Sequence, residues 1–300
     1  MDRRKFFKSV AGAGLASAAV TAAAGFGGCK QKTVKKSKKA VLKLGSQEGR
    51  IPGKNLAEKV ATLEKWGGSA IEPGGRGLPG RVKDIKKALA GTNIKVSAIC
   101  AGYEGALISS DPAEREKAVA SMSEILKAAG ELESTGLIIV PAFLSQKPME
   151  NKTARPMLID LLVKLGDVAK ASGTRILMEP LNRGETFFLR QLADAAAICR
   201  DVNHPAVAMM GDFYHMNIEE TSDLGAFLSG GEYVHHVHLA SAKRNLPGQD
   251  ERSFVEGFRG LKIIGYQDYC SLECRIKGDP MVEIPKSFDF LREQWKQAII

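Results

Sequence analysis

Cysteine is scarce in this 300-residue sequence, and its spacing excludes two common ways of stabilising a fold. The five cysteines include no Cys-x-x-Cys pair and no other zinc-site spacing. Cys270 and Cys274 lie four residues apart in an expected strand, so they share a face but are too distant for an easy bridge. The sequence therefore predicts neither a structural zinc site nor a disulfide framework.

An excess of charge of either sign is absent from residues 40–300. The whole chain has 43 basic and 34 acidic residues, but ten of the basic ones and only Asp2 precede residue 40. The remaining 33 basic and 33 acidic residues balance. A basic surface that neutralises many phosphates is not indicated, so we expect no nucleic-acid partner.

A long uncharged apolar stretch occurs only at the N-terminus, at residues 10–26, which are rich in alanine and glycine. The paired Arg3 and Arg4 precede it. This arrangement is typical of a twin-arginine export signal. The stretch is too short and too rich in small residues to favour a permanent transmembrane helix.

The segment "GFGGC" ends at Cys29 and resembles a lipoprotein box, in which the cysteine is acylated; ordinary cleavage nearby is the alternative. We expect residues 1–29 to be a signal, residues 30–39 a basic tether, and residues 40–300 the folded domain. The expected location is the periplasm. Membrane contact would come only from the leader, a lipid anchor or the tether, whose lysines suit anionic headgroups.

From residue 41 onward, expected strands and helices alternate with a short period. The expected strands are 41–45, 69–75, 95–100, 135–143, 174–180, 207–212, 233–240 and 268–274. The expected helices are 55–66, 82–89, 112–132, 153–171, 191–202, 219–228, 254–264 and 282–297. Eight such units in about 260 residues match the size of a (β/α)8 TIM barrel. A doubly wound open sheet is less favoured, because no glycine-rich phosphate turn follows the first strand.

Four polar side chains end the last four expected strands: Glu179, Asp212, His238 and Glu273. The carboxyl ends of barrel strands meet at one mouth, where the chemistry of such barrels occurs. Three carboxylates in one pocket repel one another unless a cation neutralises them. One imidazole with three carboxylates suits Mn²⁺, Mg²⁺ or Co²⁺ better than a sulfur-preferring metal. The pattern therefore predicts one divalent metal ion, although Asp212 alone is equally typical of a helix cap.

Several segments resemble the xylose isomerase-like sugar isomerase and epimerase superfamily, and within it the ketose 3-epimerase group, which includes the tagatose and allulose epimerases. The segments are "MEPLNRGE" at 178–185, "DFYHMNIEE" at 212–220, "HVHLASAKRNLPGQ" at 236–249 and "SLEC" at 271–274. The second matches the family pattern almost residue for residue. The resemblance implies a single-domain (β/α)8 barrel that acts on a small sugar.

The resemblance also implies roles for particular residues. The metal ligands would be Glu179, Asp212, His238 and Glu273. The residues that contact substrate oxygens would be Glu185, His215 and Arg244. Glu179 and Glu273 would also exchange a proton with the carbon beside a carbonyl group, through an enediolate that Mn²⁺, foremost among the suitable ions, stabilises.

The sequence departs from the family at Ser241, where a glutamate is usual, and residues 40–150 match only at the level of the fold. Substrate identity therefore stays open. A lyase or hydratase acting on a 3-keto-glycoside would use the same metal and the same base, and a non-catalytic sugar-binding lipoprotein is a third alternative. Metal-dependent abasic-site endonucleases share the fold but need more histidines than these five, all at or after His204. A homo-oligomer is also left open.

The remaining polar candidates receive structural interpretations. Glu72 ends the second expected strand, and either a pocket role or a structural role fits it. We expect His235 and His236 to be strand residues facing helices or the core, His204 to be a turn residue, and Trp66 to lie in the core.

Overall fold

The computed structural model describes residues 39–300. The expected signal 1–29, with Cys29, and almost all of the tether 30–39 lie outside the described residues.

Parallel strands alternate with helices along the described chain. The strands are β1 (Lys43–Gln47), β2 (Ala70–Glu72), β3 (Lys95–Val96), β4 (Ile99–Cys100), β5 (Leu137–Ile139), β6 (Ile176–Met178), β7 (Val207–Asp212), β8 (Val234–Leu239) and β9 (Tyr269–Leu272). The α-helices are α1 (Leu56–Lys65), α2 (Leu78–Leu89), α3 (Pro112–Glu131), α4 (Asn151–Ala171), α5 (Leu192–Val202), α6 (Phe213–Glu219), α7 (Asp223–Gly230), α8 (Val255–Ile263) and α9 (Pro280–Gln297). Two short 3-10 helices are η2 (Glu48–Arg50) and η3 (Gly231–Tyr233).

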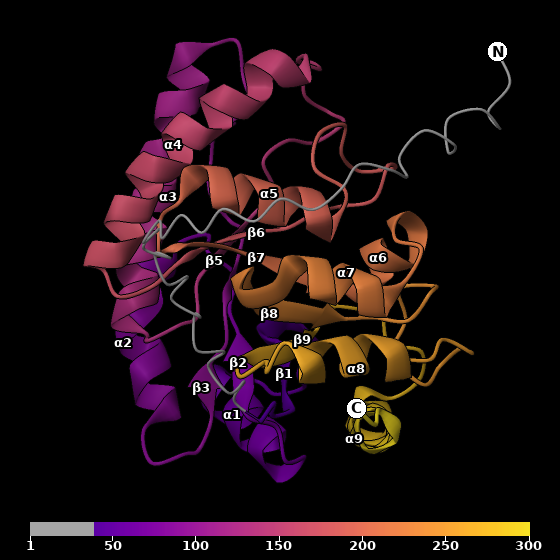
Figure 1. Cartoon of the computed structure of the whole chain (residues 1–300). Helices are drawn as coiled ribbons and strands as arrows, with labels where there is room; N and C mark the ends of the chain where they lie inside the picture. Colours follow the sequence, from indigo (N-terminus) through magenta and orange to yellow (C-terminus); the bar gives the residue numbers. More distant parts are fainter. Residues whose placement is uncertain (1–38) are drawn as a thin grey trace, which may run out of the picture. The chain divides into compact units, whose positions relative to one another are not determined.

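The strands form a barrel in the order β3-β2-β1-β9-β8-β7-β6-β5-β4, and every pair is parallel. β3 pairs with β2 and β4 pairs with β5, although only two residues separate β3 from β4. The backbone N–H of Cys100 also donates to the carbonyl of Pro73 at 3.0 Å. β3 and β4 are thus one interrupted strand, and the nine strands of residues 39–300 fill eight barrel positions. The predicted (β/α)8 fold is confirmed, with the helices outside the strands (Figure 1).

Glycines allow the backbone after β2 to approach the backbone after β4 closely. A Cβ on Gly75 would lie 2.0 Å from the carbonyl oxygen of Ala101, and one on Gly102 would lie 2.1 Å from the backbone nitrogen of Arg76. Gly102 also has a φ of +88°, a conformation that residues other than glycine rarely adopt. The seam that joins β2 to β4 therefore has no room for side chains at these two positions.

Successive strand residues point alternately into the barrel and toward the helices. One layer of the interior is apolar and consists of Ala98, Ile138, Leu177, Ala208 and Met210. Another layer is polar and consists of Glu72, Ser97, His236 and Ser271, all at most 1% exposed. The main hydrophobic core, which includes Trp66 as expected, lies between the strands and the helices.

One expected helix is wrong in its bounds. The sequence predicted a single helix over 219–228, but the structure has α6 directly after β7 and then α7. Each of these helices has its own cap: the Asp212 side chain accepts backbone N–H groups at the start of α6, and Ser222 accepts the N–H of Gly225 at the start of α7. Two capping side chains ten residues apart start two short helices instead of one.

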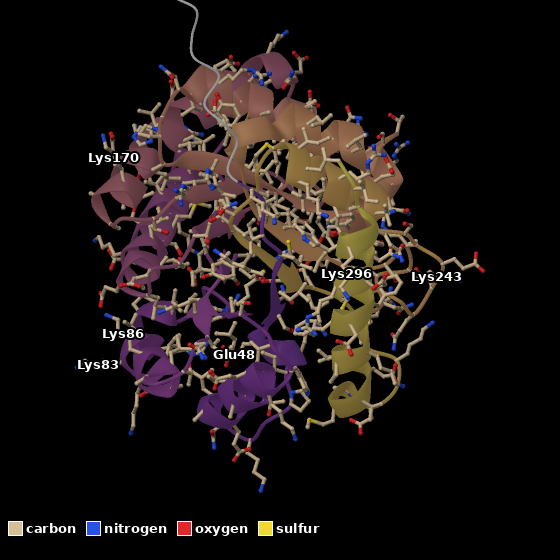
Figure 2. The ribbon with its side chains drawn as sticks, turned by 60° about the horizontal axis from the view of Figure 1, so that its bottom comes forward. Glu48, Lys83, Lys86, Lys170, Lys243 and Lys296 are labelled. Atoms are coloured by element: carbon tan, nitrogen blue, oxygen red, sulfur yellow. The ribbon has the colours of Figure 1, made fainter. Side chains whose placement is uncertain are left out.

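Basic side chains are distributed over the outside of the fold. Figure 2 labels Lys83 and Lys86 on α2, Lys170 on α4, Lys296 on α9 and Lys243 in the loop after β8. They come from four separate segments of the chain, which agrees with the balanced charge of residues 40–300. Among the helices of the described chain, none is both long and apolar enough to cross a membrane.

Candidate metal centre and active site

The four predicted metal ligands meet inside the C-terminal mouth of the barrel. Glu179 and Glu273 directly follow β6 and β9, Asp212 ends β7, and His238 lies on β8. One oxygen or nitrogen atom from each side chain lies within 4.8 Å of the others. The Nδ1 atom of His238 is 3.4 Å from Glu179 Oε1, 3.7 Å from Asp212 Oδ2 and 3.3 Å from Glu273 Oε2. These neighbouring strand ends therefore bring together three carboxylates and one imidazole, as the sequence predicted.

Three of these atoms are buried without a hydrogen-bond partner in residues 39–300: Glu179 Oε1, Asp212 Oδ2 and His238 Nδ1. Buried polar atoms of this kind destabilise a fold unless another group satisfies them. A divalent cation at their centre would satisfy all three and would neutralise the carboxylates. The donor set of three oxygens and one nitrogen fits Mn²⁺, Mg²⁺ or Co²⁺.

Asp212 uses its two oxygens differently, which reconciles the two interpretations that the sequence left open. Its Oδ1 accepts the backbone N–H of Tyr214 at 2.6 Å and that of His215 at 3.2 Å, so it caps α6. Its Oδ2 faces His238. Burial and then the charge of Glu273 raise the pKa of Asp212 well above its usual range, so its ionised form depends on a nearby cation.

The carboxylate of Glu273 is held as an anion by hydrogen bonds. Gln47 Nε2 donates to Oε1 at 2.8 Å, and Arg244 Nη2 donates to Oε2 at 3.2 Å. Burial alone would raise the pKa of Glu273, but the charges of His238 and Arg244 outweigh it and lower the pKa. For Glu179, burial dominates over His238 and raises the pKa. The two carboxylates thus differ in proton affinity.

Arg244 links the cluster to Glu185 and Tyr214. Its Nη1 donates to Glu185 Oε1 at 3.1 Å, and its guanidinium lies 4.8 Å from the centre of the Tyr214 ring. The backbone of Arg244 has a φ of +56°, a left-handed conformation that costs free energy in a non-glycine residue. With this backbone conformation, the guanidinium group of Arg244 donates hydrogen bonds to both Glu185 and Glu273.

His215, on α6, is buried and neutral. Burial and then Arg244 lower its pKa to about 3. Its Nδ1 accepts the backbone N–H of Asn182 at 3.1 Å, so the ring proton is on Nε2, which has no partner among the described residues. The Asn182 side chain also donates to Glu185 at 2.9 Å. His215 can therefore donate a hydrogen bond from Nε2 to a substrate oxygen.

Four contributing residues were not identified as site residues from the sequence. Gln47 ends β1 and contacts Glu273, 226 residues away, and no local pattern indicates that contact. Asn182 belongs to the segment "MEPLNRGE" but had no assigned role. Glu72 and His236, for which a structural role was open or expected, lie inside the barrel beneath His238.

The residues with structural interpretations lie as follows. His204 follows α5, and its Nδ1 accepts the backbone N–H of Ala206 at 3.2 Å in a turn. His235 points away from the cluster, and its Nδ1 is 2.7 Å from Asp268. Neither belongs to the site.

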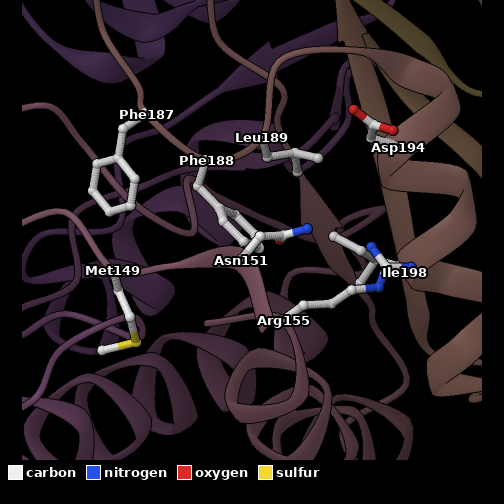
Figure 3. Close-up of a pocket in the computed structure, with 8 residues that line it drawn as sticks. All are labelled: Met149, Asn151, Arg155, Phe187, Phe188, Leu189, Asp194 and Ile198. Atoms are coloured by element: carbon white, nitrogen blue, oxygen red, sulfur yellow. The ribbon is translucent and has the colours of Figure 1, made fainter. Parts of the chain in front are cut away.

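A separate cavity of about 190 Å³ lies between α4, α5 and the loop after β6 (Figure 3). Its lining residues are Met149, Asn151, Arg155, Phe187, Phe188, Leu189, Asp194 and Ile198. Arg155 is paired with Asp201 at 2.5 Å. No lining residue belongs to the cluster of Glu179, Asp212, His238 and Glu273.

Comparisons with known proteins agree with this architecture. Residues 60–294 match the sequence model of the family described as "Xylose isomerase-like TIM barrel". The chain is 29% identical over 262 residues to 3-dehydro-D-guloside 4-epimerase of Escherichia coli K12, covering 84% of this chain and 99% of that protein. It is 29% identical over 241 residues to D-psicose 3-epimerase of Ruminiclostridium cellulolyticum, covering 76% of this chain and 80% of that protein.

Solved structures show the same likeness. The crystal structure of an E. coli 3-keto-D-glucoside 4-epimerase aligns with a TM-score of 0.79 at 29% identity, over 84% of this chain and all of that one. The structure of D-psicose 3-epimerase with D-tagatose from Clostridium cellulolyticum H10 aligns with a TM-score of 0.76 over 85% and 99% of the two chains, and at 23% identity it shows the fold alone. The predicted resemblance to sugar epimerases, and with it an isomerase of the epimerase type, is confirmed.

Proposed function

The chain belongs to the xylose isomerase-like TIM-barrel family, and from that premise we propose that it is a divalent-metal-dependent epimerase that inverts the carbon beside the carbonyl group of a keto-sugar. The observation that carries the proposal is the pair Glu179 and Glu273, whose carboxylates lie 3.4 and 3.3 Å from His238 Nδ1 within one cluster. A protein that only binds sugar needs no such pair of proton carriers.

The reaction removes a proton from one face of the substrate carbon and returns a proton to the other face. Glu179 accepts the proton from one epimer and Glu273 accepts it from the other, so the same pair works in both directions. A bound divalent ion polarises the carbonyl group and stabilises the negative charge that proton removal leaves on the substrate. Glu179, Asp212, His238 and Glu273 would hold that ion, with Mn²⁺ as the first candidate.

Three further residues would orient the sugar. His215 would donate from Nε2 to a substrate oxygen, and Arg244 and Glu185 would bind neighbouring hydroxyl groups. Arg244 also holds Glu273 ionised through its 3.2 Å hydrogen bond. Binding and proton transfer are therefore coupled through one guanidinium.

Two kinds of keto-sugar are candidate substrates. The named relatives act on a 3-keto-glycoside or on a free ketose, and in both names the inverted carbon is next to the carbonyl carbon. The 3-keto-glycosides are the first to test, because the alignment spans 99% of the E. coli relative. A lyase that expels the aglycone from such a substrate remains the alternative.

NMR in D₂O tests the proposal directly. The Mn²⁺-loaded protein is incubated with a 3-keto-glucoside and, separately, with D-psicose, and the sugars are examined after the metal is removed. An epimerase gives an inverted product that carries one deuterium at the inverted carbon. Release of the aglycone would identify a lyase instead, and neither product nor exchange from any substrate would favour a binding protein.

We also propose that the protein is exported by the twin-arginine route and anchored through Cys29. The support is the pair Arg3 and Arg4, the uncharged run at 10–26 and the "GFGGC" segment that ends at Cys29.

A further inference from the structure

A buried carboxylate lies directly behind the candidate metal centre. Glu72, the last residue of β2, is 1% exposed and lies inside the barrel. His236 Nε2 is 2.7 Å from its Oε2, and His238 Nε2 is 2.9 Å from its Oε1. The two imidazole rings are nearly perpendicular, at 86°, with centroids 5.1 Å apart. Each oxygen of Glu72 therefore accepts one N–H from a different histidine of β8.

These contacts satisfy both oxygens of the Glu72 carboxyl group inside the barrel. A buried anion of this kind is tolerated only when both of its oxygens have partners, as they do here. Glu72 is thus a fixed acceptor at the back of His238.

The orientation of His238 follows from this acceptor. Because Nε2 donates to Glu72, Nδ1 is the nitrogen that faces Glu179 and Glu273, at 3.4 and 3.3 Å. We propose that Glu72 is a positioning residue of the metal centre: it holds the ring proton of His238 on Nε2, so that the lone pair of Nδ1 points to the metal ion. The inference rests on the proposed function, and carboxylate–histidine–metal chains are an established way of orienting a ligand.

The His236 side chain is hydrogen-bonded to Glu72 and not to any of the four proposed metal ligands. Its Nε2–H is directed to Glu72, and its Nδ1 has no partner within residues 39–300. His236 thereby fixes the plane of the Glu72 carboxylate. Glu72, His236 and His238 also lie close enough to share a metal ion, but their contacts of 2.7 and 2.9 Å are hydrogen bonds that satisfy both carboxylate oxygens and both Nε2 atoms without an ion.

The variant Glu72→Gln separates this role from simple packing. The amide has nearly the same size, but its NH₂ group must face one of the two histidines and cannot accept a proton from it. Calorimetric titration of the metal-free full chain with Mn²⁺ should show an affinity about 10- to 100-fold weaker than that of the parent. Ser97→Ala is the matched control, because it removes another buried interior hydrogen bond, Ser97 Oγ to Ser271 Oγ at 3.0 Å, and should keep the parent affinity.

The ring proton of His238 is the second measurement, and a role for Glu72 in packing alone would not change its NMR signal. In ¹H–¹⁵N NMR spectra of the Mg²⁺-loaded parent, the His238 ring proton should be on Nε2 and shifted downfield by its hydrogen bond to the Glu72 carboxylate, and Glu72→Gln should move this signal upfield. Parent-like Mn²⁺ affinity in folded Glu72→Gln would overturn the inference. If this variant does not fold, the parent spectrum decides alone: a proton on Nδ1 in the loaded parent overturns the role of Glu72. A parent that binds no divalent ion rejects the metal centre itself, which is a different failure.

Discussion

Glu179 and Glu273 face the same imidazole nitrogen at nearly equal distances, but only Glu273 has hydrogen-bond donors on both of its oxygens. Gln47 and Arg244 supply those donors, whereas Glu179 Oε1 has no partner among the described residues. This asymmetry raises the proton affinity of one carboxylate and lowers that of the other. The two proposed proton carriers therefore differ in proton affinity.

Replacing either carboxylate by its amide should separate proton transfer from metal binding. Glu179→Gln and Glu273→Gln keep a carbonyl ligand but lose basicity, so Mn²⁺ affinity should weaken while turnover falls by about 10²–10⁴-fold or more. Turnover and solvent-deuterium exchange at the substrate carbon are measured on metal-saturated protein. Glu48→Gln is the control, because Glu48 pairs with Arg81 at 2.8 Å and is not one of the four clustered residues.

The exchange measurement also distinguishes an epimerase from a lyase. In an epimerase both variants fail to complete inversion, and one of them can still exchange the proton on its own face. In a lyase one carboxylate acts as the base, so the other variant keeps substantial elimination. Parent-like turnover in both metal-loaded variants would remove Glu179 and Glu273 from the mechanism.

Asp212 should show two separable functions. Asn is a good helix cap, so Asp212→Asn should retain the cap on α6 through its side-chain oxygen but lose the charged ligand. The folded-state pKa of Asp212 is raised, so its ionisation destabilises the metal-free fold as the pH rises above the ordinary value of 3.8. At pH 7 the metal-free Asp212→Asn protein should therefore unfold at a higher temperature than the parent, while its Mn²⁺ affinity falls.

Asp212→Ala and Ser222→Ala complete this comparison. Asp212→Ala loses the cap as well as the ligand and should be about 1 kcal/mol less stable than Asp212→Asn. Ser222→Ala loses only the cap of α7 and should keep full Mn²⁺ affinity. Equal unfolding free energies for Asp212→Asn and Asp212→Ala would show that the cap contributes nothing.

Arg244→Lys should impair substrate binding. Lysine keeps the charge but cannot bridge Glu185 and Glu273 with one planar group or stack in the same way on Tyr214. Losing a hydrogen bond to a charged group costs about 1.5–3 kcal/mol, so kcat/KM should fall by roughly 10- to 100-fold, through kcat as well as KM because Arg244 also holds Glu273 ionised. Steady-state kinetics measure it, with Arg259→Lys on α8 as the control; equal kcat/KM for the two variants would contradict the assignment.

Much of the site was predictable because it consists of strand ends with strong local patterns. β7 has the predicted bounds, and the alternation of His236 and His238 places both inside the barrel. Gln47 was not predictable as a site residue, because its contact with Glu273 depends on the register in which β1 pairs with β9. The roles of Glu72 and His236 likewise depend on how β2 faces β8 across the interior, and sequence spacing carries no information about that distance.

The N-terminal segment should be dispensable for folding. Deletion of residues 1–29 should leave a soluble protein whose thermal unfolding is cooperative and occurs at the same temperature as that of the full chain. Loss of cooperative unfolding would show that the segment belongs to the fold. In cells, Cys29→Ser should remove the protein from the membrane fraction, and unchanged membrane association would reject lipidation at this cysteine.

The location of one metal ion tests the central claim most directly. Crystals grown with Mn²⁺ are measured near the manganese absorption edge, for the parent and for His238→Ala, with His204→Ala as a control that lies outside the site. The account predicts a single strong anomalous peak per chain in the parent and in His204→Ala, about 2.1 Å from Glu179 Oε1, Asp212 Oδ2 and His238 Nδ1 and within bonding distance of Glu273. The peak should be lost or strongly reduced in His238→Ala. A parent crystal without a peak at these four side chains, or a peak of full height in His238→Ala, would contradict the account.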